Sequence, residues 1–105
     1  MANSTRHKSL FSRKRPPRVV TILGHKIKVR IKPYLEDDGV ELYGAFDYNS
    51  KTIWLMKGCD WRGVLLHEMC HAVLALSGTG EGLGQAKEES IVVALEHSLA
   101  PLLFI

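Results

Sequence analysis

The fold is decided by one helix, which carries the stretch Val64-Leu65-Leu66-His67-Glu68-Met69-Cys70-His71-Ala72-Val73-Leu74. In and around this stretch, apolar residues recur at positions 61, 64, 65, 69, 72, 73 and 76, which is helical spacing. Asp60 stands at a suitable N-cap position, and residues 77–84 hold four glycines, which end the helix and form a flexible connection. The sequence therefore predicts a helix from about Trp61 to Leu76.

Outward from this helix, the sequence predicts a second helix and a small sheet. An apolar stripe with helical spacing runs through about Gln85 to Leu103, and it consists of Ile91, Val92, Leu95, Leu99 and Leu102. Four segments before residue 57 have strand character: Val19–Leu23, Ile27–Ile31, Glu41–Tyr48 and Thr52–Met56. Turn residues separate consecutive strands. We therefore expect an α+β fold in which an antiparallel sheet of about four strands, a meander, packs on two main helices.

Length and charge define the domain organisation. A chain of 105 residues with 46% hydrophobic residues is one domain with a modest core. Residues 1–18 hold six basic residues, no acidic residue and the Pro16-Pro17 pair, so we expect a flexible basic N-terminal arm followed by a single domain over residues 19–105. Beyond the arm, eight basic residues face eleven acidic ones, which argues against a basic nucleic-acid-binding surface across the domain.

The arm itself could contact nucleic acid or an acidic partner through Arg13-Lys14-Arg15. It has no interleaved aromatic residues and no recognition helix, so its composition is typical of a solvated tail.

The expected location is cytoplasmic, with no membrane contact. The longest apolar stretches fall far short of the roughly 20 residues that a membrane-spanning helix needs. The N-terminal charges are not followed by an apolar segment of the secretory type. Two cysteines, Cys59 and Cys70, could form at most one disulfide, so the pattern favours reduced thiols.

The long helix contains the spacing H-E-x-x-H, formed by His67, Glu68 and His71. Residues four apart lie on the same face of a helix, so both imidazoles can reach one Zn²⁺ at about 2.0–2.1 Å. Glu68 lies beside them, where it can act as general base on a metal-activated water. Burying two histidines and a glutamate on an apolar helix is costly without a function. The spacing therefore predicts a zinc site with Glu68 as its catalytic residue.

A third metal ligand is expected from Glu88 or Glu89, 17 and 18 residues after His71. An antiparallel second helix would pass the first one at this point. Glu88 projects from the centre of the apolar stripe, which favours it slightly, whereas Glu89 lies at the edge and would suit a ligand if the helix were rotated. Three side chains are available as oxyanion donors, although none is singled out: Tyr43, Tyr48 and His97.

Together, the strand-rich front half, the His67–His71 motif and the Glu88-Glu89-x-x-Val92 helix resemble a minimal zincin metallopeptidase of the gluzincin type. More narrowly, residues 19–103 are similar to small H-E-x-x-H proteins encoded by bacteriophages and prophages, distantly related to the ImmA/IrrE peptidases. The resemblance implies that an edge strand before the helix, here Thr52–Met56, receives an extended peptide. Gluzincins often carry an aspartate four residues after the ligand glutamate, but here Val92 or Val93 stands there.

The function expected from these features is zinc-dependent hydrolysis of peptide bonds in a peptide or protein substrate, with a water activated by the metal and Glu68 as general base. The alternative is a non-catalytic, phage-derived interaction protein, which zinc stabilises and which binds a partner through its basic arm.

Overall fold

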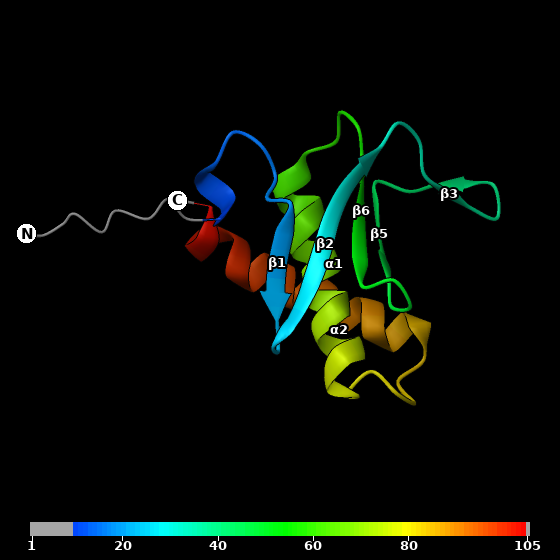
Figure 1. The fold of residues 1–105 in the computed structure, drawn as a ribbon. Coiled ribbons are helices and arrows are strands. Elements are labelled where there is room, and N and C mark those ends of the chain that lie inside the picture. Colours follow the sequence, from blue (N-terminus) through cyan, green and yellow to red (C-terminus); the bar gives the residue numbers. More distant parts are fainter. Residues whose placement is uncertain (1–9, 105) are drawn as a thin grey trace, which may run out of the picture.

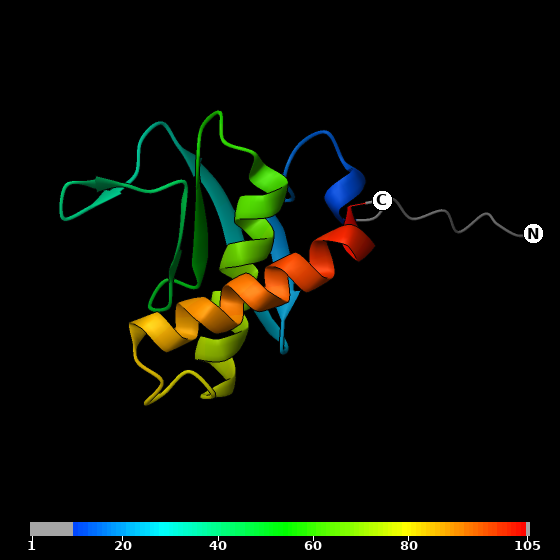
Figure 2. The ribbon, with the colours of Figure 1, turned by 180° about the vertical axis from the view of Figure 1, so that it is seen from behind.

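The strands and helices lie in three layers in the computed structural model, which describes residues 10–104 (Figure 1). The sheet is one outer layer. The helix α1 (Trp61–Ser77) packs on its inner face, and α2 (Gln85–Leu103) crosses α1 on the side away from the strands (Figure 2). The expected α+β class, with two helices and a sheet of four strands, is confirmed.

The sheet is mixed rather than antiparallel, which corrects the expected meander. Its strand order is β1-β2-β6-β5, with β2 and β6 parallel and the two other pairs antiparallel. The short strands β3 and β4 pair with each other in a separate hairpin that projects from the body. The bounds of the strands are β1 Val19–Ile22, β2 His25–Lys32, β3 Glu36–Asp37, β4 Val40–Glu41, β5 Gly44–Asp47 and β6 Thr52–Met56.

The last strand, β6, lies inside the sheet between β2 and β5, so the expectation that Thr52–Met56 is an edge strand is wrong. The edge strands of this sheet are β1 and β5. The composition of β6 explains its place: Thr52, Ile53 and Leu55 are buried and Trp54 and Met56 are half-buried, as in a strand with a neighbouring strand along each edge. A polar turn between β5 and β6 makes them neighbours, but it does not decide which other strand β6 joins.

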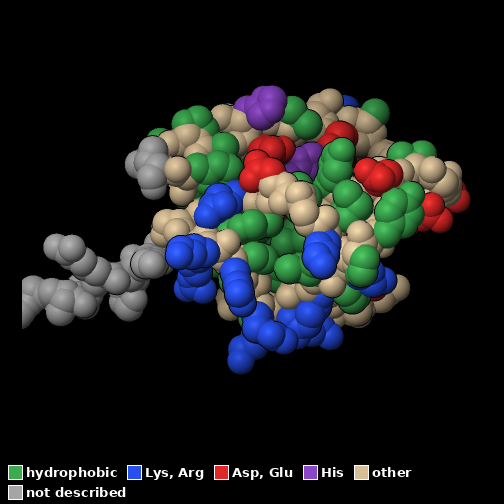
Figure 3. Space-filling view, turned by 90° about the horizontal axis from the view of Figure 1, so that it is seen from above, with side chains coloured by type: hydrophobic (Ala, Val, Ile, Leu, Met, Phe, Trp, Pro, Cys, Tyr) green, Lys and Arg blue, Asp and Glu red, His purple; other side chains and the backbone are tan. Residues whose placement is uncertain are grey.

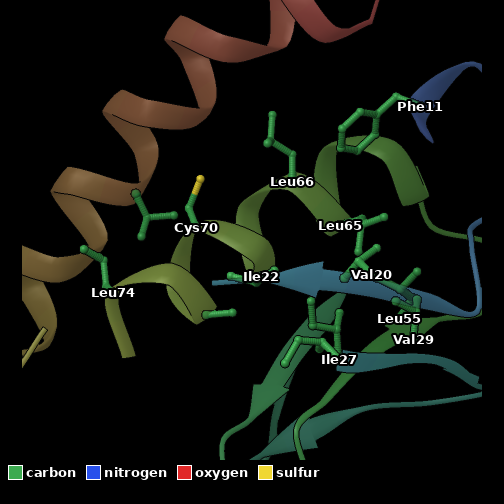
Figure 4. Packing of buried hydrophobic residues seen from close by; sticks show 13 residues of the cluster. Phe11, Val20, Ile22, Ile27, Val29, Leu55, Leu65, Leu66, Cys70 and Leu74 are labelled. Carbon is green, nitrogen blue, oxygen red and sulfur yellow. The ribbon is translucent and has the colours of Figure 1, made fainter. Parts of the chain in front are cut away.

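The middle layer, α1, is apolar on two faces because it is covered from both sides. Leu65 points toward the strands, whereas Cys70 and Leu74 point toward α2 (Figure 4). The largest fully buried side chains come from all three layers. They are Ile27 of β2, Ile53 and Leu55 of β6, Leu65 of α1 and Val92 of α2. The long helix is therefore held in place by packing on both sides.

The helix bounds agree closely with the sequence. The second helix has the expected bounds, and α1 extends one residue further than expected, to Ser77. Asp60 occupies the N-cap position of α1, although its side chain makes no capping hydrogen bond. At the other end Gly78 adopts a left-handed conformation, with φ of 77°, which a side chain would disfavour. The glycine-rich connection thus ends the helix as predicted.

The described part of the predicted arm, residues 10–18, packs against the domain. Phe11, in a short 3-10 helix (Leu10–Ser12), is 5% exposed, and its ring lies 6.4 Å from Trp61 and 5.0 Å from Phe104 between centroids. Arg62 donates from Nε to the Phe11 carbonyl at 2.6 Å and from Nη2 to the Arg13 carbonyl. The core therefore extends beyond the expected boundary at residue 19. Residues 1–9 of the arm lie outside the described residues.

Both cysteines are free thiols, and no helix within residues 10–104 is long and apolar enough to cross a membrane. Cys70 is buried in the hydrophobic core and Cys59 is half-buried beside it, as expected of packing residues. Burial raises the pKa of both thiols, so the thiolate form is disfavoured.

Phe11→Ala should lower the free energy of unfolding by about 3 kcal/mol, because it empties an aromatic site in the core. Urea denaturation followed by circular dichroism measures this change. Lys14→Ala, at an exposed position nearby, is the control and should change it by less than about 0.5 kcal/mol. Equal, small effects of the two substitutions would mean that residues 10–18 are a dispensable arm.

A close approach between β5 and α1 depends on a glycine. A Cβ added to Gly44 would lie 2.4 Å from Val64 Cγ1 and 3.2 Å from both Glu68 Cγ and the Trp54 carbonyl oxygen. Val64 is β-branched and stiff, so it cannot swing aside cheaply. Gly44 therefore lets the edge strand lie directly against the helix that carries the histidines.

We expect Gly44→Ala to destabilise the protein by about 1–3 kcal/mol through overpacking. Gly44→Ala combined with Val64→Ala should be less destabilising than the sum of the two single substitutions, since Val64→Ala removes the clashing methyl group. Urea midpoints of the four proteins measure this coupling. Additive effects would show that the contact with Val64 is not the constraint.

Candidate metal centre

The helix α1 presents His67 and His71 on the face that α2 crosses, and one carboxylate meets both imidazoles. The rings lie one helical turn apart, with centroids separated by 5.0 Å. Glu89 of α2 places Oε1 2.9 Å from His67 Nε2 and Oε2 3.1 Å from His71 Nε2. The predicted spacing thus brings both histidines to one point, and the second helix supplies an acid there.

Each histidine also contacts a second carboxylate through its other ring nitrogen. Glu96 Oε1 lies 2.8 Å from His67 Nδ1, and Glu88 Oε2 lies 2.6 Å from His71 Nδ1. A carboxylate at Nδ1 favours a proton on that nitrogen and leaves the lone pair of Nε2 directed at the common point. Three acids of α2 therefore hold the two imidazoles in one orientation.

The structure distinguishes the two candidates for the third ligand. Glu89 faces both Nε2 atoms, whereas Glu88, which the sequence slightly favours, lies behind His71 as the partner of Nδ1. The reason is the rotation of α2. Val92 is fully buried, whereas Leu95 and Leu99 are 39% and 36% exposed. The face that packs on α1 is thus turned away from the centre of the apolar stripe and toward Glu89.

Sequence reasoning missed Glu96 as a member of the site. It lies seven residues, close to two helical turns, after Glu89, so both acids project from one side of α2. The seven-residue spacing from Glu89 could have indicated Glu96, provided that the rotation of α2 were known. Where gluzincins often carry an aspartate, four residues after the ligand glutamate, this chain has Val92 or Val93. The carboxylates that contact Nδ1 of the two histidines come instead from Glu88 and Glu96.

The donor set fits a divalent metal ion. Ligand atoms of His67, His71 and Glu89 lie within 4.8 Å of one another. Two imidazole nitrogens and one carboxylate oxygen are the three protein ligands of many catalytic zinc sites. The side chain of Glu89 is 48% exposed and the two imidazoles are 24% and 21% exposed, so the point where they meet is open to solvent. These three residues are the ones that could hold the ion.

The acids change the titration of the neighbouring histidine. Burial alone lowers the pKa of His67, but the hydrogen bond with Glu96 and the negative charges of Glu68, Glu89 and Glu96 outweigh it and raise the pKa. The site is therefore one of concentrated negative charge, which attracts a cation to it.

Glu68 lies on the side of α1 that faces the edge strand. It is 8% exposed, and burial raises its pKa, although the nearby His71 and His67 oppose this shift. Within residues 10–104 its carboxylate makes no hydrogen bond or ion pair with another side chain. A carboxylate with no such partner keeps its oxygens available to accept a proton.

A groove of about 460 Å³ is lined by Glu68 together with His71 and Glu89, two of the three candidate ligands. Its walls are β5 with the flanking residues on one side and the two helices on the other, and they comprise Leu42, Gly44, Ala45, Phe46, Tyr48, Glu68, His71, Ala75, Gln85, Glu88 and Glu89. Of the three side chains considered as oxyanion donors, Tyr48 lines this groove. Tyr43 does not line it and is 60% exposed, and His97 is an exposed residue of α2 outside the groove.

No protein-family model, curated protein or solved structure matches this chain. The resemblance to gluzincins consequently depends on the motif residues themselves.

Substitutions of the three acids should separate the metal ligand from the positioning residues. Glu89→Gln should weaken zinc binding by more than 100-fold, because it removes a ligand, whereas Glu88→Gln and Glu96→Gln should weaken it by about 10- to 100-fold. Competition with a chromophoric chelator at fixed pH measures the affinities. Glu81→Gln, at an exposed site in the connection, is the matched control and should change little. A larger loss from Glu88→Gln than from Glu89→Gln would reverse the assignment.

Proposed function

We propose that the protein is a zinc-dependent peptidase in which His67, His71 and Glu89 hold the metal and Glu68 is the general base. The observation that carries this proposal is the meeting of both imidazole Nε2 atoms at one carboxylate, with Glu68 beside them in a groove open to solvent. The resemblance to gluzincins agrees with it. When bound, Zn²⁺ lowers the pKa of a water toward about 7 and polarises a carbonyl oxygen.

The side chains around the ion have separate tasks in this proposal. Glu68 accepts a proton from the attacking water and delivers it to the leaving amine. Glu88 and Glu96 keep the proton of each imidazole on Nδ1, so that Nε2 remains a ligand atom. Tyr48, at the side of the groove, is the remaining candidate for stabilising the developing oxyanion.

A peptide would bind along β5 rather than β6. In the described residues β5 pairs only with β6, so its other backbone edge lies free beside the groove. An extended peptide can add to such an edge through main-chain hydrogen bonds. Because β5 is four residues long, the strand offers contacts to a short segment of the substrate.

We also propose a cytoplasmic location. Its support is that Cys59 and Cys70 are free thiols, as in proteins of reducing compartments.

The decisive experiment compares the wild type with Glu68→Gln. The substitution keeps size and polarity but removes the base, so zinc content should stay stoichiometric while cleavage of a broad peptide library falls by about 10²- to 10⁴-fold. Elemental analysis and mass spectrometry of the library measure the two quantities. Glu89→Gln, in contrast, should reduce both metal content and cleavage.

Two results would contradict the peptidase proposal: undetectable cleavage by the zinc-loaded wild type, or cleavage that persists unchanged in Glu68→Gln. Undetectable cleavage with a zinc-dependent rise in the unfolding temperature would instead support the non-catalytic, zinc-stabilised protein.

A further inference from the structure

The outer face of the sheet carries a straight row of basic side chains. Along β2, Ile27 and Val29 are buried toward α1, so the alternating residues between and beside them face the other way. These residues form the basic row: Lys26, Lys28, Arg30 and Lys32. Figure 3 shows Lys and Arg side chains gathered on the sheet side of the molecule, while acidic side chains lie with the histidines on the helix side.

An aromatic side chain stands next to this row. In the parallel pairing, Arg30 lies opposite Trp54 of β6, so both belong to the same face. Trp54 is half-buried, and Lys32 Nζ lies 4.3 Å from the centroid of its ring. Asp47 of β5 is on this face as well, separated from Lys28 by Thr52 of β6, and the Ser50 hydroxyl and the Asn49 N–H donate to it.

The geometry points to a linear, negatively charged ligand with flat groups. Basic residues two apart on a strand repeat at roughly 6.7 Å, comparable to the distance between successive phosphates of an extended nucleic-acid strand. Proteins bind single strands without sequence preference by combining a basic track with aromatic rings on which bases stack, and here the half-buried ring of Trp54 lies beside the basic row. We propose that the outer sheet face, defined by the basic row and Trp54, binds single-stranded nucleic acid.

The overall charge of the chain conceals this surface. Beyond residue 18 acidic residues outnumber basic ones, but eight of the eleven acids lie around the histidines or in the hairpin of β3 and β4. The helix α1 separates the outer sheet face from the candidate metal centre, which lies between α1 and α2. The proposal therefore stands whether or not the protein cleaves peptides.

The test measures fluorescence anisotropy of a labelled 20-nucleotide oligothymidylate and of the matching oligouridylate with the full chain. With about four phosphate contacts, log K should fall with log salt concentration at a slope of about −3. Lys26→Gln/Lys28→Gln should halve that slope and weaken binding at least tenfold. Lys87→Glu, at an exposed position of α2, changes the net charge by the same two units away from the sheet and should weaken binding less than twofold. The two oligonucleotides show whether DNA or RNA is preferred.

Tryptophan provides a second readout. Trp54→Leu should weaken binding about five- to tenfold and leave the salt slope unchanged, because stacking rather than charge is lost. Oligothymidylate should quench the fluorescence of Trp61→Phe, which retains Trp54, but not that of Trp54→Leu. Circular dichroism of each variant verifies the fold.

Three outcomes would overturn the proposal. One is the absence of binding at low salt, and another is an equal loss of affinity in Lys26→Gln/Lys28→Gln and in Lys87→Glu, which would mean attraction by net charge alone. The third is displacement of the oligonucleotide by polyglutamate at concentrations where unlabelled oligothymidylate has no effect, which would assign the face to an acidic protein.

Discussion

The contact of α2 with α1 is the constraint on which the candidate site depends. Four carboxylate contacts, at 2.6–3.1 Å, join three acids of α2 to both nitrogens of two imidazoles on α1. So many charges placed together are costly unless a cation or a set of hydrogen bonds compensates them. Apolar packing supplies the rest of the contact, because Val92 is completely buried between the helices.

The sheet positions the other half of the site. By packing on the inner face of the strands, α1 turns Glu68 toward β5 and the histidines toward α2. Gly44 allows the edge strand to approach the helix, so that strand and helix together line the groove. The catalytic chemistry that we propose thus requires one helix to be covered on two sides, each of which contributes different residues.

Periodicity in the sequence predicted where helices and strands lie better than it predicted which strands pair with each other. Both helices, three of the strands and the pairing of the two histidines follow from local spacing, which a single chain displays directly, whereas the expected strand Glu41–Tyr48 is divided between β4 and β5 and the strand β3 was not expected. The parallel pairing of β2 and β6 does not, because it depends on which strand fills the centre of the sheet. The buried pattern of Thr52–Met56 is the clue that it is an interior strand.

The sequence left the third ligand open between Glu88 and Glu89, with a slight preference for Glu88, for a related reason. A stripe of leucines suggested the orientation of α2, yet part of that stripe is exposed, and the helix is rotated so that Glu89 and Glu96 meet the imidazoles. A rotation of this kind is set by the partner helix and cannot be read from one helix alone. Likewise, Phe11 looked like part of a polar arm, because its partners Trp61 and Phe104 are distant in sequence.

The contact between the tilted rings of Phe11 and Phe104 also brings the two ends of the described chain together. A short linker could join them, and new ends could be opened within the exposed, glycine-rich residues 78–84. Such a circular permutant would begin with α2 and finish with α1, so the carboxylates and the imidazoles would come from opposite ends of the chain. The order of the elements along the polypeptide is thus separable from the arrangement of the site.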